Sequence, residues 1–192
     1  MKTLAVFAAA LLLGASAASA QIIPPAPRIE VRPWAGARIP TGPQRDVFRT
    51  APVYGVQTAI EMTPMLHLLG SFGWSPGHSK FDVGDRGVDV FQYDLGAEYN
   101  IVVPVTRGWD LKPFAGVGAG ARTYHYDAED LATNSALTAY GSGGTELQRG
   151  FAALRVESRG YLFGFTDPMT DDWDARNEVG LSLGFAYHFP TR

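Results

Sequence analysis

The stretch EVGLSLGFAYHF, Glu178–Phe189, alternates between two kinds of residue throughout its length. Every second position from Val179 to Phe189 is apolar, and the interleaved positions hold glutamate, histidine and small residues. Successive side chains of a β-strand point to opposite faces, so a period of two is typical of a strand with one apolar face. The segment therefore predicts a strand, and the two faces must meet different surroundings.

The same alternation recurs along the chain and predicts eight strands. They cover residues 28–39, 51–62, 65–75, 88–100, 111–126, 137–148, 151–165 and 177–189. Long connections at 40–50, 76–87, 127–136 and 166–176 alternate with shorter ones at 63–64, 101–110 and 149–150. Short turns at one end and longer loops at the other are typical of a membrane β-barrel, whose short turns are periplasmic. An even number of strands then places both termini at the periplasmic end.

The beginning of the chain predicts export. Residues 1–20 combine Lys2, an apolar run and a final Ala-Ser-Ala, which is the pattern of a cleaved secretory signal peptide. Residues 21–27 are rich in proline and are interpreted as an extended periplasmic tether before the barrel, which we place at 28–190. The chain has no cysteine and a formal net charge of −3, so neither disulfides nor a nucleic-acid partner is expected.

The polar face of each strand indicates which side of the sheet lies inside. In the strand at 88–100, one face carries Gln92, Asp94, Gly96 and Glu98, and the other carries Phe91, Tyr93, Leu95, Ala97 and Tyr99. Glycine next to charged residues suits a crowded lumen, where long side chains need small neighbours. Strands in lipid must pair every backbone group, which requires a closed barrel. The sequence thus predicts an all-β fold: an eight-stranded antiparallel up-and-down transmembrane β-barrel in the outer membrane of a Gram-negative cell.

Several segments together resemble a known family. The glycine-rich run KPFAGVGAGARTYHYD (Lys112–Asp127), the segment GSGGTELQ (Gly141–Gln148), the strand FAALRVES (Phe151–Ser158) and the closing VGLSLGFAYHF are similar to the second half of the OmpA-like and OmpX-like outer-membrane β-barrels. The resemblance implies contact with outer-membrane lipid and lipopolysaccharide, and insertion by machinery that reads the last strand. The family's chains usually end at an aromatic residue, whereas Pro190, Thr191 and Arg192 follow Phe189 here.

The strand phases turn charges of both signs into the predicted lumen. These residues are Glu30, Arg32, Arg38, Glu61, Asp94, Glu98, Lys112, Arg122, Glu146, Arg155, Glu157, Arg159 and Glu178. Arginine and carboxylate groups can satisfy each other in a poorly hydrated interior. An eight-stranded barrel is only just wide enough for side chains to fill it, so a plug of ion pairs is favoured over a narrow ion pathway.

Aromatic residues gather at the predicted strand ends. Trp74 lies toward the loop end, and Tyr99, Trp109, Tyr187 and Phe189 lie toward the periplasmic end, as expected for the girdles of a membrane barrel. Trp34 is an exception, since its phase turns it inward, where it is expected to fill a gap beside a glycine. Ordinary core aromatics of a soluble sandwich are the alternative interpretation.

The sequence gives little support for metal binding or catalysis. The loop at 166–176 holds four aspartates that could bind Ca²⁺, but it lacks the glycine and the closing glutamate of an EF-hand loop. None of the four histidines has the His-x-Ser spacing of the lipid A deacylase barrels, so no catalytic residue, cofactor or metal is expected.

Three functions remain open at this point. The first is a structural or surface-interaction protein that meets an unidentified extracellular partner through its loops. The second is a porin-like, low-conductance pore. The third comprises a lipid A-modifying enzyme and a lipocalin-like binder. The charged inner face argues against the lipocalin-like binder, whose cavity would be lined by apolar side chains.

Overall fold

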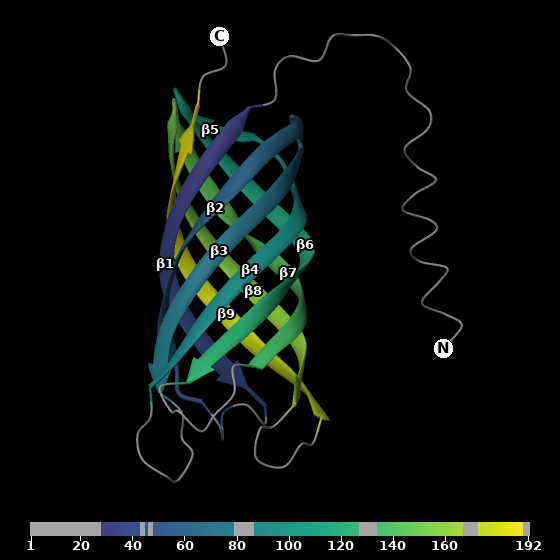
Figure 1. The fold of residues 1–192 in the computed structure, drawn as a ribbon. Helices are drawn as coiled ribbons and strands as arrows, with labels where there is room; N and C mark the ends of the chain where they lie inside the picture. Colours follow the sequence, from purple (N-terminus) through teal and green to yellow (C-terminus); the bar gives the residue numbers. More distant parts are fainter. Residues whose placement is uncertain are drawn as a thin grey trace, which may run out of the picture.

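The chain forms a closed antiparallel barrel (Figure 1). The computed structural model describes residues 28–42, 45, 48–78, 87–126, 134–166 and 173–189. Its strands are β1 (Ile29–Thr41), β2 (Ala51–Thr63), β3 (Leu66–His78), β4 (Gly87–Asn100), β5 (Val103–Thr106), β6 (Trp109–Tyr126), β7 (Asn134–Arg149), β8 (Ala152–Thr166) and β9 (Trp173–His188). The predicted signal peptide at 1–20 and the tether at 21–27 lie outside the described residues.

Eight of these strands make the barrel wall. β1 to β4 pair in chain order, as do β6 to β9, and the ring closes through antiparallel pairing of β1 with β9 and of β4 with β6. Each barrel strand therefore has a partner on both sides, which removes the free edges that cannot exist in hydrocarbon. The prediction of an eight-stranded antiparallel up-and-down barrel is confirmed.

The alternation of apolar and polar residues along each strand separates the inside of the barrel from the outside. On β9, Glu178 is 1% exposed, whereas Leu183 on the opposite face is 60% exposed. On β4, Asp94 is buried and Leu95 is 74% exposed. The barrel is therefore inverted relative to a soluble protein, with charges inside and an apolar belt outside. No helix long and apolar enough to cross a membrane occurs within the described ranges.

The two ends of the barrel differ. β1 begins and β9 ends at the same end, where Glu30 pairs with His188 (Figure 1). The turn between β7 and β8 lies at that end too, and Gly150 adopts a φ of 60° there, which favours glycine. We call this the terminus end. The other end, the loop end, carries the four predicted long loops, much of which falls outside the described residues.

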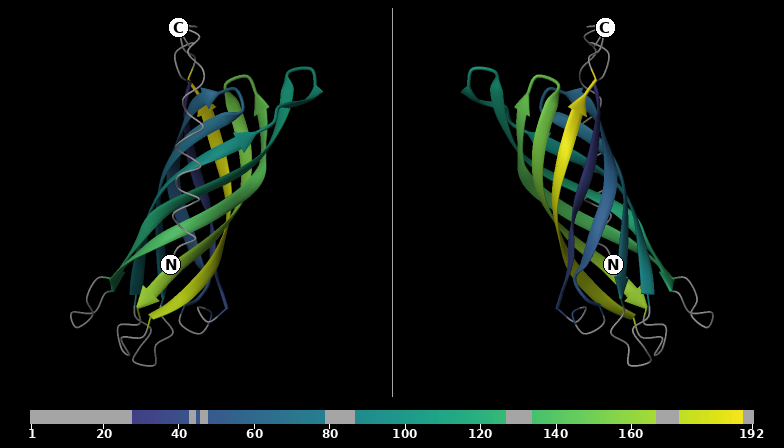
Figure 2. Two further views of the ribbon diagram at one scale, coloured as in Figure 1. Left: turned by 90° about the vertical axis from the view of Figure 1, so that its right-hand side faces the viewer. Right: turned by 90° about the vertical axis from the view of Figure 1, so that its left-hand side faces the viewer.

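The connection predicted at 101–110 contains a strand, so that prediction is wrong in part. β5 pairs with the beginning of β6, Val103 opposite Leu111, and the two strands form a hairpin. The hairpin projects beyond the barrel wall at the terminus end and leans away from it (Figure 2). Its turn contains Gly108 with a φ of 79°. Four of the five residues from Ile101 to Val105 are β-branched, which favours this strand over a plain turn, and Pro104 is tolerated on an edge strand.

Candidate functional site in the barrel lumen

Glu98 lies at the centre of the charged lumen. Arg155 on β8 donates hydrogen bonds to both oxygens of Glu98 on β4, with 3.3 Å between Nη1 and Oε1. Arg32 on β1 donates to the same Oε1 at 3.3 Å. All three residues are at most 4% exposed. One carboxylate therefore joins three strands across the lumen, and charge-assisted hydrogen bonds of this kind are the strong ones.

A second cluster lies between this centre and the terminus end. His188 on β9 places Nδ1 2.8 Å from Oε1 of Glu30 on β1 and Nε2 3.4 Å from Oε1 of Glu146 on β7. Lys112 on β6 lies 4.0 Å from the same Glu146 oxygen. Arg155 reaches Glu146 at 3.7 Å and so connects this cluster to the centre.

Arg159 organises the middle of the lumen. Its Nη1 donates to Oδ2 of Asp94 at 2.9 Å, and its Nε donates to Oε1 of Glu157 at 2.7 Å. The Tyr161 hydroxyl donates to Oδ2 of Asp94 as well, at 2.9 Å. The second oxygen of Glu157 accepts from Arg155 at 3.0 Å. Glu157 therefore connects the central and middle clusters.

The loop end of the lumen is richer in arginine. Arg122 on β6 lies 2.9 Å from Glu178, and Arg38 on β1 donates to the other oxygen of Glu178 at 3.5 Å. Arg122 also donates to Gln92 at 3.2 Å, and Gln92 donates to Asp94 at 2.7 Å. These contacts complete a chain of polar side chains that runs along the lumen from the terminus end to the loop end.

Aromatic rings pack against the arginines. The guanidinium of Arg155 lies 3.4 Å from the centre of the Phe114 ring, that of Arg159 lies 4.6 Å from Tyr140, and that of Arg122 lies 4.2 Å from Tyr161. Cation–π contacts of this kind are strongest where water is excluded. The rings fill space that the ion pairs leave and hold the guanidinium planes in place.

Phe48 closes the described part of the loop end. It lies between β1 and β2, is 1% exposed and stacks on Tyr124 at 5.7 Å between ring centres. The guanidinium of Arg38 lies 5.6 Å from the Phe48 ring. The two rings belong to a buried cluster that covers the arginine-rich end, made of Phe48, Val88, Val90, Tyr124, Ala136, Tyr140, Tyr161 and Phe163. We call this cluster the aromatic cap.

Glycines make room for the large rings, as predicted for Trp34. The Trp34 ring lies so close to Gly55 and Gly73 that a Cβ atom at either position would press against it. The Tyr140 ring occupies the equivalent space beside Gly96 and Gly118. The glycines of the inner face are therefore packing positions.

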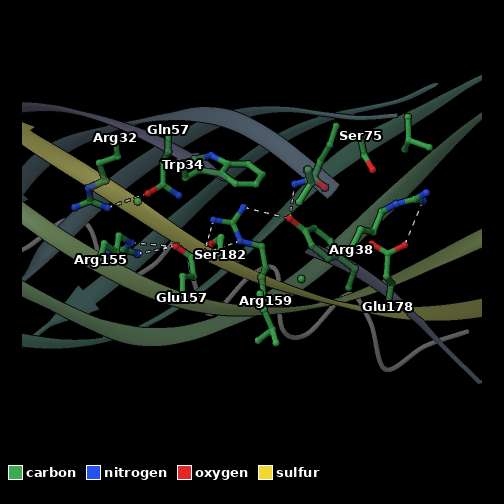
Figure 3. A pocket seen from close by; sticks show the side chains of 17 residues that line it. Arg32, Trp34, Arg38, Gln57, Ser75, Arg155, Glu157, Arg159, Glu178 and Ser182 are labelled. Atoms are coloured by element: carbon green, nitrogen blue, oxygen red, sulfur yellow. Dashed lines mark hydrogen bonds and ion pairs between the residues drawn. The ribbon is translucent and has the colours of Figure 1, made fainter. Parts of the chain in front are cut away.

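Little free volume remains inside. A lumenal cavity of about 40 Å³ is lined by residues that include Arg32, Trp34, Gln57, Arg155, Glu157 and Arg159 (Figure 3). One water molecule needs roughly 10–15 Å³ of such volume, so the cavity has room for only a few waters. The side chains therefore fill the described lumen.

The structure places the predicted lumenal charges as follows. Buried are Glu30, Arg32, Arg38, Asp94, Glu98, Arg122, Glu146, Arg155, Glu157, Arg159 and Glu178. Lys112 is partly buried, with a side-chain exposure of 16%. Glu61 does not belong to the network: it is partly exposed at the terminus end, next to a register shift between β2 and β3, and joins none of the ion pairs among the described residues.

Sequence reasoning missed some of the buried polar groups. Arg176 brings the buried arginines to six, which equals the number of buried aspartates and glutamates in the described residues. Gln57 Oε1 accepts a hydrogen bond from Arg32 Nη1 at 3.0 Å, and Asn100 contacts His67 at 3.0 Å. The inward aromatics Phe114, Tyr124, Tyr140, Tyr161 and Phe163 were also missed. Their strand phase could have found them, because Tyr161 and Phe163 share the phase of Arg159.

Four residues of the predicted girdle lie on the outer face, and one lies differently. Trp74, Tyr99, Tyr187 and Phe189 are 39–51% exposed. Trp74 lies at 6.2 Å from Tyr54, and Tyr187 lies at 4.9 Å from Phe189. Trp109 is half-buried at the base of the projecting hairpin turn, with the guanidinium of Arg149 at 5.2 Å from its ring.

Solved structures show what the chain is similar to. No family model and no curated protein sequence matches it. Neisserial surface protein A (NspA) matches with a TM-score of 0.67 at 10% identity, covering 84% of this chain and 97% of that one. The outer membrane protein OprG and the N-terminal barrel domain of OprF, both from Pseudomonas aeruginosa, match with TM-scores of 0.55 and 0.54 at 11% and 15% identity. They cover 87% and 84% of this chain, and 97% of each of theirs.

The fold is therefore that of the small eight-stranded outer-membrane β-barrels, and the resemblance expected from the sequence is confirmed at the level of the fold. At these identities the comparison carries no assignment of activity or ligand.

Proposed function

We propose that this protein spans the outer membrane as a closed, non-catalytic barrel and acts as a structural or surface-interaction protein through its long loops. The proposal rests on three properties of the described residues: a closed ring of strands, an apolar outer belt, and charges that lie in the lumen or near the two ends of the barrel. Hydrocarbon is the surrounding that suits all three, because it requires a closed barrel and tolerates no outward charge.

The filled lumen is the observation that supports a structural or surface-interaction role for this protein. A cavity of about 40 Å³ among paired arginines and carboxylates has no room for a solute. The surfaces left to meet a partner are the two ends of the barrel and the outer wall. Long loops at 40–50, 76–87, 127–136 and 166–176 are the segments that would face the outside, where they can contact lipopolysaccharide or an extracellular partner.

We infer the orientation from the short periplasmic turns and long extracellular loops that are typical of outer-membrane barrels. Both termini would lie in the periplasm, with the short turns, and the insertion machinery would read the last strand, β9. A narrow pore is the second candidate function, because polar side chains form a continuous chain along the lumen. It requires the ion pairs to open, since the cavity itself is too small to conduct.

Impermeant maleimide labelling on intact cells tests location and orientation, because the chain has no cysteine of its own. Thr50→Cys places a thiol at the loop end and Pro64→Cys places one at the terminus end, both at exposed positions. We expect Thr50→Cys to be labelled on intact cells, and Pro64→Cys only after the outer membrane is permeabilised. The reverse pattern would contradict the orientation. A chain that does not fractionate with the outer membrane would contradict the location.

A further inference from the structure

The hairpin at the terminus end continues the apolar wall of the barrel past its rim. Ile101 and Val103 share the phase of Tyr99, which faces outward, because the register with β6 is unchanged from Tyr99 to Val103, which lies opposite Leu111. Ile101 is 50% exposed and Val103 is 43% exposed. The extended chain from Tyr99 to Val103 spans about 13 Å, since a strand rises roughly 3.3 Å per residue. This apolar strip therefore reaches well beyond the level of the aromatic girdle.

Such a strip would be costly in water. Exposed apolar groups on a free strand edge favour association with another surface, and within the described part of the chain β5 pairs on one side only, with β6. The hairpin does not stand parallel to the barrel axis but leans outward from the wall (Figure 2). In a barrel that spans a bilayer, a hairpin tilted in this way lies over the adjacent leaflet.

The tip of the hairpin carries the groups that suit a lipid headgroup region. Arg107 is exposed in the turn, Trp109 follows Gly108, and Arg149 of β7 packs its guanidinium over the Trp109 ring at 5.2 Å. Tryptophan favours the headgroup level, and arginine pairs with phosphate. Asp110 is the nearest acidic residue in the strand, so the tip bears more positive than negative charge.

We propose that the segment Ile101–Trp109 is a membrane-surface hairpin. Its outward face (Ile101 and Val103) lies in the acyl boundary of the leaflet next to the chain termini, and Arg107 and Arg149 contact the phosphates of phospholipid headgroups. The inference rests on the proposed membrane location. It extends the lipid contact of the protein beyond the barrel wall and predicts that this hairpin binds the surface of the periplasmic leaflet.

Spin labels on single cysteines test the proposal in reconstituted vesicles of phosphatidylethanolamine and phosphatidylglycerol. Val103→Cys lies on the apolar face, Pro104→Cys lies next to it on the opposite face, Leu95→Cys reports the barrel wall in lipid, and Thr50→Cys reports water. We expect Val103→Cys to resemble Leu95→Cys, with high accessibility to oxygen and low accessibility to a nickel chelate. Pro104→Cys is expected to be several-fold more accessible to the chelate.

Other outcomes separate the hairpin from the barrel. Equal chelate accessibility at Val103→Cys and Pro104→Cys, with Leu95→Cys in lipid, would overturn the hairpin proposal alone. Spin–spin broadening at Val103→Cys would overturn it in favour of a second copy that pairs with the free edge of β5. Chelate access at Leu95→Cys would show that the wall itself is not in lipid, and the proposed function would fail. Arg107→Gln with the Val103 label should move the label toward water in the anionic vesicles and not in phosphatidylcholine vesicles.

Discussion

Glu178→Gln tests whether the lumenal ion pairs act as a structural network. Glu178 lies 2.9 Å from Arg122 and 3.5 Å from Arg38, and it is the one carboxylate that either arginine contacts among the described residues. The amide keeps the size of the side chain and removes its charge. Two buried guanidinium groups then lose their counter-ion. Removing one partner of a buried ion pair costs about 3–5 kcal/mol, so we expect a loss of unfolding free energy in that range.

Glu157→Gln is the matched control, because its arginines have other partners. Arg159 keeps Asp94 at 2.9 Å, and Arg155 keeps Glu98. We therefore expect a smaller loss, about 1.5–3 kcal/mol, as for a hydrogen bond to a charged group. Urea titration in phospholipid vesicles, followed by tryptophan fluorescence, measures both. An equal loss in the two variants, or a neutral Glu178→Gln, would refute the argument that counter-ion number sets the cost.

Three further predictions concern packing and the outer wall. Phe48→Ala removes a fully buried ring from the aromatic cap and should lower the unfolding free energy by about 3 kcal/mol in the same titration, whereas Phe48→Leu should lower it less. Leu95→Arg places a charge on the outward face of β4 and should cost about 2–4 kcal/mol near the bilayer midplane. Gly55→Val would press against the Trp34 ring and should abolish the folded band on unboiled gels, whereas Gly141→Val, with open space around it, should fold. A folded Gly55→Val would contradict the packing account.

The sequence predicts most of the wall of this barrel because alternation is a local property. The strand predicted at 177–189 corresponds to β9 at Trp173–His188, and the one at 51–62 corresponds to β2 at Ala51–Thr63. The phase of a strand also determines which side chains are lumenal, so charges such as Glu98 and Arg155 could be placed inside. The hairpin of β5 was missed since residues 101–110 were interpreted as a connection, although Val102, Val103 and Val105 favour a strand.

The pairing of the charges could not be predicted. Arg155 and Glu98 are not neighbours in the sheet: β8 and β4 lie on different sides of the barrel, and only closure and the register of every strand between them bring the two together. Phe48 gives no signal either, because a single aromatic residue in a connection has no periodicity to identify its face. The acidic loop at 166–176 falls largely outside what the structure describes, so the prediction on calcium stays untested.

The lumen of this protein is best understood as a core made of ion pairs. In a soluble barrel, apolar side chains would fill the interior, whereas here the outer face already holds them and the inner face carries arginine, carboxylate and aromatic groups. A buried ion pair adds little stability compared with apolar packing, but losing one partner is strongly destabilising. Such a network therefore favours one register of the strands over the alternatives, because a shifted strand would leave charges unpaired.

Single-channel recording in planar lipid bilayers tests the central claim that the lumen is closed. The protein should first show heat-modifiable migration on gels, which establishes that the inserted material is a folded barrel. We predict no discrete openings from the wild type, since the lumenal cavity of about 40 Å³ has no continuous path for hydrated ions. Reproducible openings whose size changes with Arg155→Ala or Glu157→Ala would contradict this claim and would support a pore constricted by those residues.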